Sequence, residues 1–250
     1  MNDSLNVLIL SQNDYKENDA LLKTFSLEKG IVTFIAKGLL KSESKNAAAC
    51  MPFSESNLTY DDKESGGLQI LHSASLNTSH RALREDLNKQ TVMTIICELI
   101  ELLLKDNYDQ SLIQDCFKVV KQCLSTIENT DKYAHTITYF LVTSLIWLGV
   151  EPQVDECTLC GDNQINSFSM EEGGFICVNC QKEIQSPIYT TEFLYAFRIV
   201  NKVTADNFDR YLNYKTPDKA LIELLYNFMK YHTNISLKSW VFLEKWSIIN

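Results

Sequence analysis

The first eighty residues alternate short apolar runs with polar turns, a spacing typical of β-strands. The tripeptide Glu28-Lys29-Gly30 separates two of these runs and predicts a hairpin turn, with the glycine at a left-handed position. About five strands in this length favour a small closed barrel of the oligonucleotide/oligosaccharide-binding (OB) type, with an SH3-like barrel as the alternative. The predicted strands are residues 5–10, 19–25, 31–36, 53–60 and 68–74.

The apolar period then changes to three and four residues. Val92, Ile95, Ile96 and Leu99 follow this spacing in a stretch that begins at Arg81, which predicts a long helix. Further helices are predicted at residues 111–127, 133–148, 190–200, 208–214 and 218–231. We therefore predict an α+β multidomain chain, with a barrel at residues 1–79 and a helical domain at residues 80–250.

Four cysteines form two CxxC pairs, Cys157/Cys160 and Cys177/Cys180, with sixteen residues between them. Each pair places two sulfurs on one tight turn, and the intervening stretch is long enough for a hairpin that brings the pairs together. This spacing predicts a tetrahedral, structural zinc site, because four thiolates close the coordination shell. Two redox CxxC motifs are the alternative, which the lack of a βαβ pattern disfavours. The predicted zinc module covers residues 153–185 and interrupts the helical domain.

The charge of the chain is unevenly distributed. The net charge is −9, and residues 151–186, with one lysine and seven acidic residues, carry −6 of it. The remainder is close to neutral, so a local basic face for DNA is compatible with the composition. The other four cysteines are scattered, which indicates a reducing compartment and a cytoplasmic protein. No apolar run resembles a signal peptide or a membrane span.

The sequence contains no motif for catalysis or for binding a small-molecule substrate. It has no GxGxxG, phosphate-binding loop or nucleophile elbow, and its four histidines lie outside any CxxH or HExxH pattern. Glu171 and Glu172 are adjacent carboxylates and are interpreted as solvated charge. We therefore expect a protein that is not an enzyme.

The order of several motifs resembles the RecO family of bacterial recombination mediators over nearly the whole chain. The most specific parts are Leu148-Gly-Val-Glu-Pro152 leading into Cys157-Thr-Leu-Cys-Gly161, and Gly173-Gly-Phe-Ile-Cys177 before the second pair. The Lys37-Gly38 step after the third strand and Leu237-Lys-Ser239 near the end are informative only in this order.

The resemblance implies a non-enzymatic, nucleoid-associated bacterial protein. RecO-like proteins bind single- and double-stranded DNA, anneal complementary strands, and act with RecR to load RecA on strands coated by single-stranded-DNA-binding protein (SSB). They also recognise the acidic tail of SSB. The alternative is a zinc-stabilised interaction adaptor that makes no DNA contact of its own. This chain departs from the family in one respect, because its barrel contains no arginine where the family loop is rich in it.

Candidate DNA contacts begin in residues 37–51, a stretch predicted to be an exposed, mobile loop at the end of a barrel strand. A solvated lysine loop is the alternative interpretation. Tyr15, Phe25, Phe34 and Phe53 could stack on bases, although Phe25 and Phe34 lie in strands and favour the core. The predicted DNA-binding residues are Lys37, Lys41, Lys45, Lys16, Lys23, Arg81 and Arg84.

A partner surface is predicted near the C-terminus. Lys238 and Trp240 lie in an aromatic segment that also contains Phe242, Lys245 and Trp246. A cation beside an apolar pocket suits an acidic, hydrophobic peptide such as the SSB tail. Packing of these aromatic side chains onto the helices is the alternative.

Overall fold

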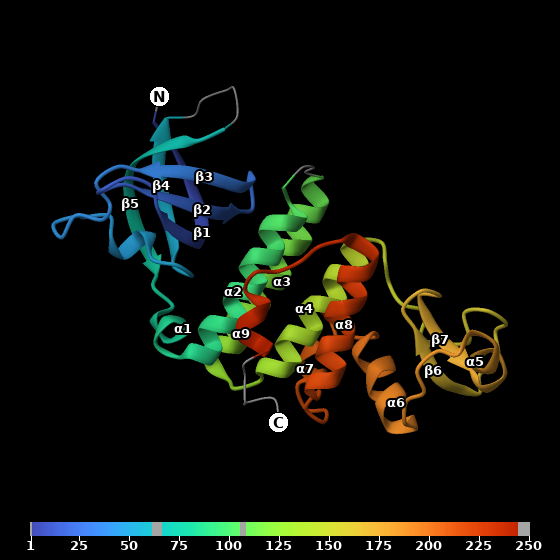
Figure 1. The fold of residues 1–250 in the computed structure, drawn as a ribbon. Coiled ribbons are helices and arrows are strands. Elements are labelled where there is room, and N and C mark those ends of the chain that lie inside the picture. The colour runs from blue at the N-terminus through green and yellow to red at the C-terminus, as the bar shows by residue number, and fades with distance from the viewer. Residues whose placement is uncertain (1, 62–66, 106–108, 245–250) are drawn as a thin grey trace. The chain divides into compact units, whose positions relative to one another are not determined.

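The structure is a computed structural model that describes residues 2–61, 67–105 and 109–244. The chain divides into two compact units (Figure 1). We call Met1–Asp131 with Leu237–Lys245 the barrel unit, and the unit built on Lys132–Ser236 the cysteine unit. Within the described residues, no helix is long and apolar enough to cross a membrane.

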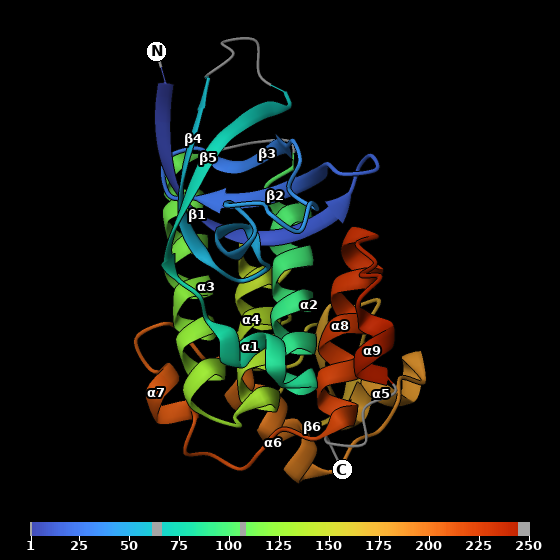
Figure 2. The same ribbon diagram turned by 90° about the vertical axis from the view of Figure 1, so that its left-hand side faces the viewer.

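The five strands of the barrel unit close into a barrel in the order β1-β2-β3-β5-β4 (Figure 2). A short parallel pairing of β3 with β5 completes the ring, while the other neighbours are antiparallel. This topology is that of an OB-type barrel, so the predicted fold is confirmed. The strands are β1 (Asn2–Asp14), β2 (Ala20–Ser26), β3 (Gly30–Ala36), β4 (Glu55–Asp61) and β5 (Gln69–Thr78).

The first strand is much longer than the predicted residues 5–10, because it pairs with two neighbours in turn. Its first half pairs with β4 and its second half with β2, and the register shifts between Ile9 and Ser11. Such an irregularity bends a strand and increases its twist, which lets one strand serve both sides of the barrel. The ends of β1 are polar, so an apolar pattern could not reveal them.

The segment at residues 37–51 is partly buried, contrary to the prediction of an exposed loop. Leu39 and Cys50 belong to the barrel core, where they are 4% and 0% exposed. Residues Ala48–Cys50 form a short 3-10 helix, and the Ser56 hydroxyl donates a hydrogen bond of 2.6 Å to the carbonyl of Ala49. The apolar side chains of this segment therefore pack in the barrel core, while its lysines are exposed.

The helix expected to start at Arg81 is broken in two. Asp86 has extended backbone angles, and its carboxylate accepts hydrogen bonds from the amides of Asn88 and Lys89. An N-cap of this kind starts a new helix, so the stretch that was predicted as one helix forms two helices. The helices of the barrel unit are α1 (Arg81–Glu85), α2 (Leu87–Leu103), α3 (Gln110–Asn129) and α9 (Trp240–Glu244).

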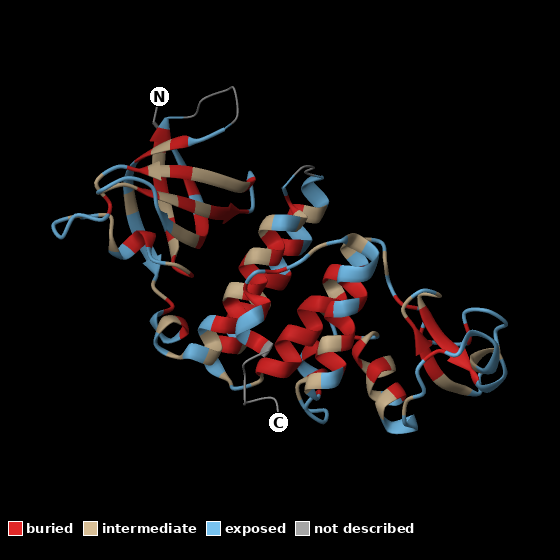
Figure 3. Cartoon of the chain, viewed as in Figure 1, coloured by how far each residue is buried: buried red, intermediate tan, exposed pale blue. Residues whose placement is uncertain are grey.

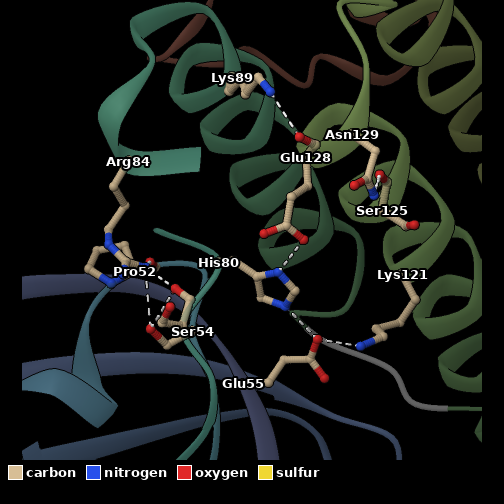
Figure 4. A network of polar contacts seen from close by, with 11 residues as sticks. Pro52, Ser54, Glu55, His80, Arg84, Lys89, Lys121, Ser125, Glu128 and Asn129 are labelled. Carbon is tan, nitrogen blue, oxygen red and sulfur yellow. Dashed lines mark hydrogen bonds and ion pairs between the residues drawn. The ribbon is translucent and has the colours of Figure 1, made fainter. Parts of the chain in front are cut away.

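His80, between β5 and α1, links the barrel to α3 (Figure 4). Its Nε2 and Nδ1 atoms each lie 2.7 Å from a carboxylate oxygen, of Glu55 on β4 and of Glu128 on α3. The ring therefore lies within hydrogen-bond distance of a carboxylate on each side, which connects β4 to α3. Lys121 of α3 also pairs with Glu55. Burial opposes the ionisation of Glu55, but hydrogen bonds from Lys121 and His80 outweigh it and lower the pKa of this carboxyl.

The cysteine unit consists of helices and one two-stranded sheet. Helix α4 is buried on nearly every side, as Figure 3 shows, so it forms the centre of this unit. The predicted helices are present within a few residues of their expected ends. The elements are α4 (Tyr133–Trp147), β6 (Ile165–Ser169), β7 (Gly174–Cys177), α5 (Val178–Ile184), α6 (Thr191–Val200), α7 (Phe208–Tyr211) and α8 (Lys219–Thr233).

A fully buried histidine lies in the first turn of α4. The Nε2–H group of His135 donates to the backbone carbonyl of Tyr214 over 3.1 Å, and its Nδ1 atom has no hydrogen-bond partner among the described residues. Burial lowers the pKa of His135 and dominates over the opposing effect of the Tyr214 carbonyl. The folded protein therefore disfavours the second proton on this ring.

We expect the stability of the cysteine unit to fall as the pH drops below about 6.5, the ordinary pKa of histidine. The unfolded chain then binds a proton that folded His135 rejects, which costs up to about 1 kcal/mol for one pH unit. Denaturant unfolding at several pH values should show this loss, and His135→Gln should reduce it. The exposed His232 provides a control, because His232→Gln should retain the full pH dependence. Equal pH dependence in wild type and His135→Gln would contradict the assignment.

Candidate metal centre and nucleic-acid interface

The two cysteine pairs meet at one point of the cysteine unit. Cys157 and Cys160 lie on a turn, Cys177 ends β7, and Cys180 lies in the first turn of α5. The four Sγ atoms all lie within 4.8 Å of one another. The Sγ atom of Cys160 is 3.6 Å from that of Cys177 and 3.5 Å from that of Cys180. The antiparallel hairpin β6–β7 is the predicted return that brings the second pair to the first.

These distances fit a tetrahedral metal site. Four sulfurs at the usual zinc–sulfur bond length of about 2.3 Å are separated by about 3.8 Å along each edge of the tetrahedron. The separations of 3.5 and 3.6 Å in the structure agree with this edge. The chain thus presents a four-cysteine cluster that can hold a metal, with a donor set that favours a soft or borderline ion.

Backbone hydrogen bonds lower the pKa of one of these thiols and so favour the thiolate form that binds a metal. Burial raises the pKa of the Cys157 thiol, but the backbone amides of Cys177, Cys160 and Leu159 outweigh it and lower this pKa to about 7. In contrast, burial raises the pKa of Cys50 to about 12. The Cys157 thiol therefore has backbone donors that stabilise its thiolate, whereas burial alone acts on Cys50.

The glycines before the second pair allow the chain segments to pack closely. A β-carbon on Gly174 would lie 2.4 Å from the carbonyl oxygen of Gln153, so no larger residue fits there. The Gln153 amide donates to the Gly173 carbonyl over 2.9 Å, and the Phe175 amide donates to the Gln153 carbonyl over 2.8 Å. The Gly-Gly motif is thus explained by a third chain segment that pairs with the hairpin.

Aromatic side chains attach the hairpin to the helices of its unit. The ring of Phe168 on β6 lies 4.9 Å from that of Phe197 on α6 and 5.6 Å from that of Phe228 on α8. Arg198 of α6 also donates to the backbone carbonyl of Val154 over 2.7 Å. A metal that organises this segment would therefore also organise the packing of two helices.

The structure brings the β1–β2 loop and the segment after β3 together at one end of the barrel. The amide of Gly38 donates to the Asp19 carboxylate over 2.8 Å, and the amide of Leu40 donates to the Asn18 carbonyl over 3.0 Å. Gly38 has a φ of 64°, which favours glycine at this turn. Asp19 was missed as a positioning residue, because nothing in the local pattern shows which loop it contacts.

Four of the predicted DNA-binding lysines lie on these two segments and are exposed. Within the described residues, none of the four forms an ion pair, and the Lys16 ammonium lies 5.4 Å from the ring centroid of Tyr15. Tyr15 is also 43% exposed, whereas the other three candidate stacking residues are buried. We call this surface the lysine loop. It consists of Lys16, Lys37, Lys41 and Lys45.

The remaining predicted DNA contacts lie apart from the lysine loop and have internal partners. Lys23 pairs with Glu101 of α2, and Arg81 pairs with Glu85 on the exposed side of α1. Arg84 donates to the backbone carbonyls of Pro52 and Ser79, which fixes the start of α1 against the barrel. These three residues stay predictions as DNA contacts.

The predicted partner-binding residues lie at the start of α9, held by a carboxylate of α2. Glu98 accepts hydrogen bonds of 2.8 Å from the backbone amides of Lys238 and Ser239, and a third from the Ser239 hydroxyl. The Lys238 side chain is exposed, whereas Trp240 is 4% exposed and packs inside the unit. The Leu-Lys-Ser tripeptide thus has a structural explanation. Lys245 and Trp246 lie outside the described residues.

The fold and the cysteine cluster define a class of protein, namely an OB-type barrel followed by helices with a cluster of four cysteines that can hold a metal. A family model described as "Recombination protein O N terminal" matches residues 1–80, and one described as "Recombination protein O C terminal" matches residues 84–240. The chain therefore belongs to the RecO family, as the motifs predicted.

Curated relatives agree with this assignment. A "DNA repair protein RecO" of Clostridium perfringens is 32% identical over 207 residues, which cover 80% of each chain. A relative of the same name from Oceanobacillus iheyensis is 26% identical over 245 residues, covering 96% of this chain and 92% of the relative. A third, from Thermoanaerobacter sp., is 25% identical over 246 residues, covering 95% of both. The similarity thus extends across both units.

Proposed function

We propose that this protein is a non-enzymatic DNA repair adaptor of the bacterial cytoplasm. It binds single- and double-stranded DNA, anneals complementary strands, and acts with RecR to load RecA on SSB-coated single strands. The observation that carries the DNA contact is the lysine loop. Two chain segments, held together by hydrogen bonds from the amides of Gly38 and Leu40, present exposed ammonium groups at one end of an OB barrel. Barrels of this type bind single strands through such loops.

The charge of this surface is modest, which bears on the strength of binding. The four lysines are accompanied by Glu17, Asp19 and Glu43, and Asp19 is already engaged by the amide of Gly38. We therefore propose weak, salt-sensitive binding to phosphates without sequence preference. The same modest charge favours the second candidate function, a protein-interaction adaptor whose barrel contacts only partners such as RecR.

The double variant Lys37→Glu/Lys41→Glu should weaken single-stranded DNA binding at least tenfold, because it reverses two charges on the proposed contact surface. Its thermal midpoint should not change, since both side chains are exposed. Fluorescence anisotropy with a labelled oligonucleotide measures the affinity. Lys182→Glu/Lys230→Glu is the matched control, because it changes the net charge equally at exposed positions of the cysteine unit. Equal affinities of the two double variants would exclude the lysine loop as the DNA contact.

We propose that the four clustered cysteines hold one structural zinc ion. Zinc suits four thiolates in a tetrahedron, and a shell closed by four protein ligands is typical of a structural site. When bound, the metal would cross-link the turn, the hairpin and α5, and it would supply no reactive group. Contact with the SSB tail is proposed at α9 and the residues just before it, where Lys238 offers an exposed cation and Phe242 is 56% exposed.

A further inference from the structure

An exposed aromatic ring lies among the ammonium groups of the lysine loop. Tyr15, between β1 and β2, is 43% exposed, and the Lys16 ammonium lies 5.4 Å from the centroid of its ring. The other three aromatic residues that were candidates for base stacking, Phe25, Phe34 and Phe53, are at most 2% exposed. Of these four residues, Tyr15 is therefore the one that can offer its ring to a ligand.

The backbone around Tyr15 is held in a closed turn. The amides of Tyr15 and Lys16 donate to the Asp19 carbonyl over 3.0 and 3.4 Å, and the Asp19 carboxylate accepts a hydrogen bond from the Gly38 amide over 2.8 Å. Asp19 thus connects the turn that carries the ring to the segment that carries three of the four lysines. Because the fold itself fixes this turn, a ligand that binds the ring does not have to order the loop, which lowers the entropic cost of binding.

A second apolar side chain is exposed at the same end of the barrel. The amide of Leu40 donates to the carbonyl of Asn18 over 3.0 Å, which places Leu40 beside the turn that carries Tyr15, and Leu40 is 36% exposed. The surface therefore combines ammonium groups with apolar area. Because protein–protein interfaces are depleted of lysine at their centre, this combination favours a ligand that carries both phosphates and flat apolar groups.

We propose that Tyr15 forms a base subsite, at which its ring stacks on one unpaired nucleobase while the lysines of the lysine loop contact the phosphates on either side. The inference rests on the proposed DNA-binding function and adds a cause of selectivity to it. In a duplex both faces of each base are covered by the neighbouring bases, so a ring on the protein surface has no base to stack on. Ammonium groups alone favour the duplex, because it has the higher charge density. Tyr15 therefore shifts the preference of the protein toward single strands.

Removing the ring should change the two affinities differently. Tyr15→Ala should bind an oligothymidine of about twenty nucleotides about tenfold more weakly than wild type, because base stacking is lost. Binding of a duplex of the same length should stay within about twofold, and the slope of log affinity against log salt should not change, since no cation is removed. Equal losses for single strand and duplex, or no loss for either, overturn the inference.

Two variants control for the loss of the side chain itself. Tyr15→Phe keeps the ring and removes only the hydroxyl, so it should bind single strands within about twofold of wild type. Tyr195→Ala removes a tyrosine that is 64% exposed on α6 of the cysteine unit, and it should leave both affinities unchanged. If Tyr15→Phe or Tyr195→Ala loses as much affinity for the single strand as Tyr15→Ala, the loss does not come from stacking at Tyr15 and the inference is wrong.

A cross-link made with the wild-type protein locates the base directly. When a strand that contains 5-iodouracil is irradiated, this base forms a bond to an aromatic ring stacked on it, and mass spectrometry identifies the residue. A cross-link at Tyr15 supports the base subsite, and cross-links confined to other residues overturn it.

The failure of this inference and that of the proposed function are distinguishable. If wild-type protein binds neither single strands nor duplexes at low salt, the proposed DNA-binding function itself is wrong. If wild type binds both and Lys37→Glu/Lys41→Glu weakens both, while Tyr15→Ala changes neither, only the base subsite is wrong.

Discussion

Replacing Cys157 with alanine should release the metal and unfold the hairpin segment of the cysteine unit. Cys157 is 2% exposed and supplies one of four sulfurs, so its loss removes both a ligand and a packed side chain. Structural zinc contributes on the order of 10 kcal/mol to the folding of small zinc modules, and three remaining thiolates hold it far less tightly. We expect metal content to fall from about one ion to below about 0.1 per chain. The thermal midpoint should drop by about 10 °C or more.

Cys116→Ala is the matched control for this experiment. Cys116 is also buried, at 0% exposed, but belongs to α3 of the barrel unit and is not one of the clustered cysteines. Its replacement removes a comparable volume from a core and should cost about 1 kcal/mol while keeping the metal. Elemental analysis and a thermal scan on both variants separate the two effects. Full metal content in Cys157→Ala would contradict the metal centre.

Replacing His80 with alanine should destabilise the barrel unit by about 2–3 kcal/mol. The ring is 8% exposed and bridges Glu55 and Glu128, which are 25% and 28% exposed. Its removal leaves two partly buried carboxylates with fewer donors, and partial exposure moderates the cost below that of a fully buried pair. His80 also has a φ of 43°, which alanine adopts unfavourably. Urea unfolding followed by circular dichroism measures the change.

Arg81, the residue after His80, offers a control for the effect of burial on what an ion pair contributes to the free energy of unfolding. Arg81 makes an ion pair with Glu85 in which the two side chains are 77% and 58% exposed. Arg81→Gln should therefore change the free energy of unfolding by no more than about 0.5 kcal/mol. If His80→Ala costs no more than Arg81→Gln, the network of Figure 4 does not stabilise the unit.

Local patterns predicted the elements of the fold well, because the period of apolar positions directly reflects strand and helix geometry. These apolar patterns gave wrong helix and strand boundaries where polar groups determine the structure. The N-cap at Asp86 splits one predicted helix, and the polar ends of β1 extend a strand beyond its apolar run. The Ser/Ala-rich composition of residues 37–51 predicted an exposed loop. Three side chains of this segment nevertheless enter the barrel core or pack near it.

The candidate metal centre could be predicted from the sequence. The CxxC spacing places two sulfurs on each turn independently of the rest of the fold. Contacts between residues that are far apart in the sequence could not be predicted. Glu98 holds the backbone of Lys238, 140 residues later, and Lys23 pairs with Glu101. Such pairs depend on the path of the whole chain, so no local spacing indicates them.

We propose that this RecO-family protein contacts the DNA backbone through the lysine loop. A salt titration of single-stranded DNA binding by the wild-type protein tests it most directly. Four lysines at the contact predict a slope of log affinity against log salt of about −3. A slope near zero, or no binding at about 50 mM salt, would contradict the account.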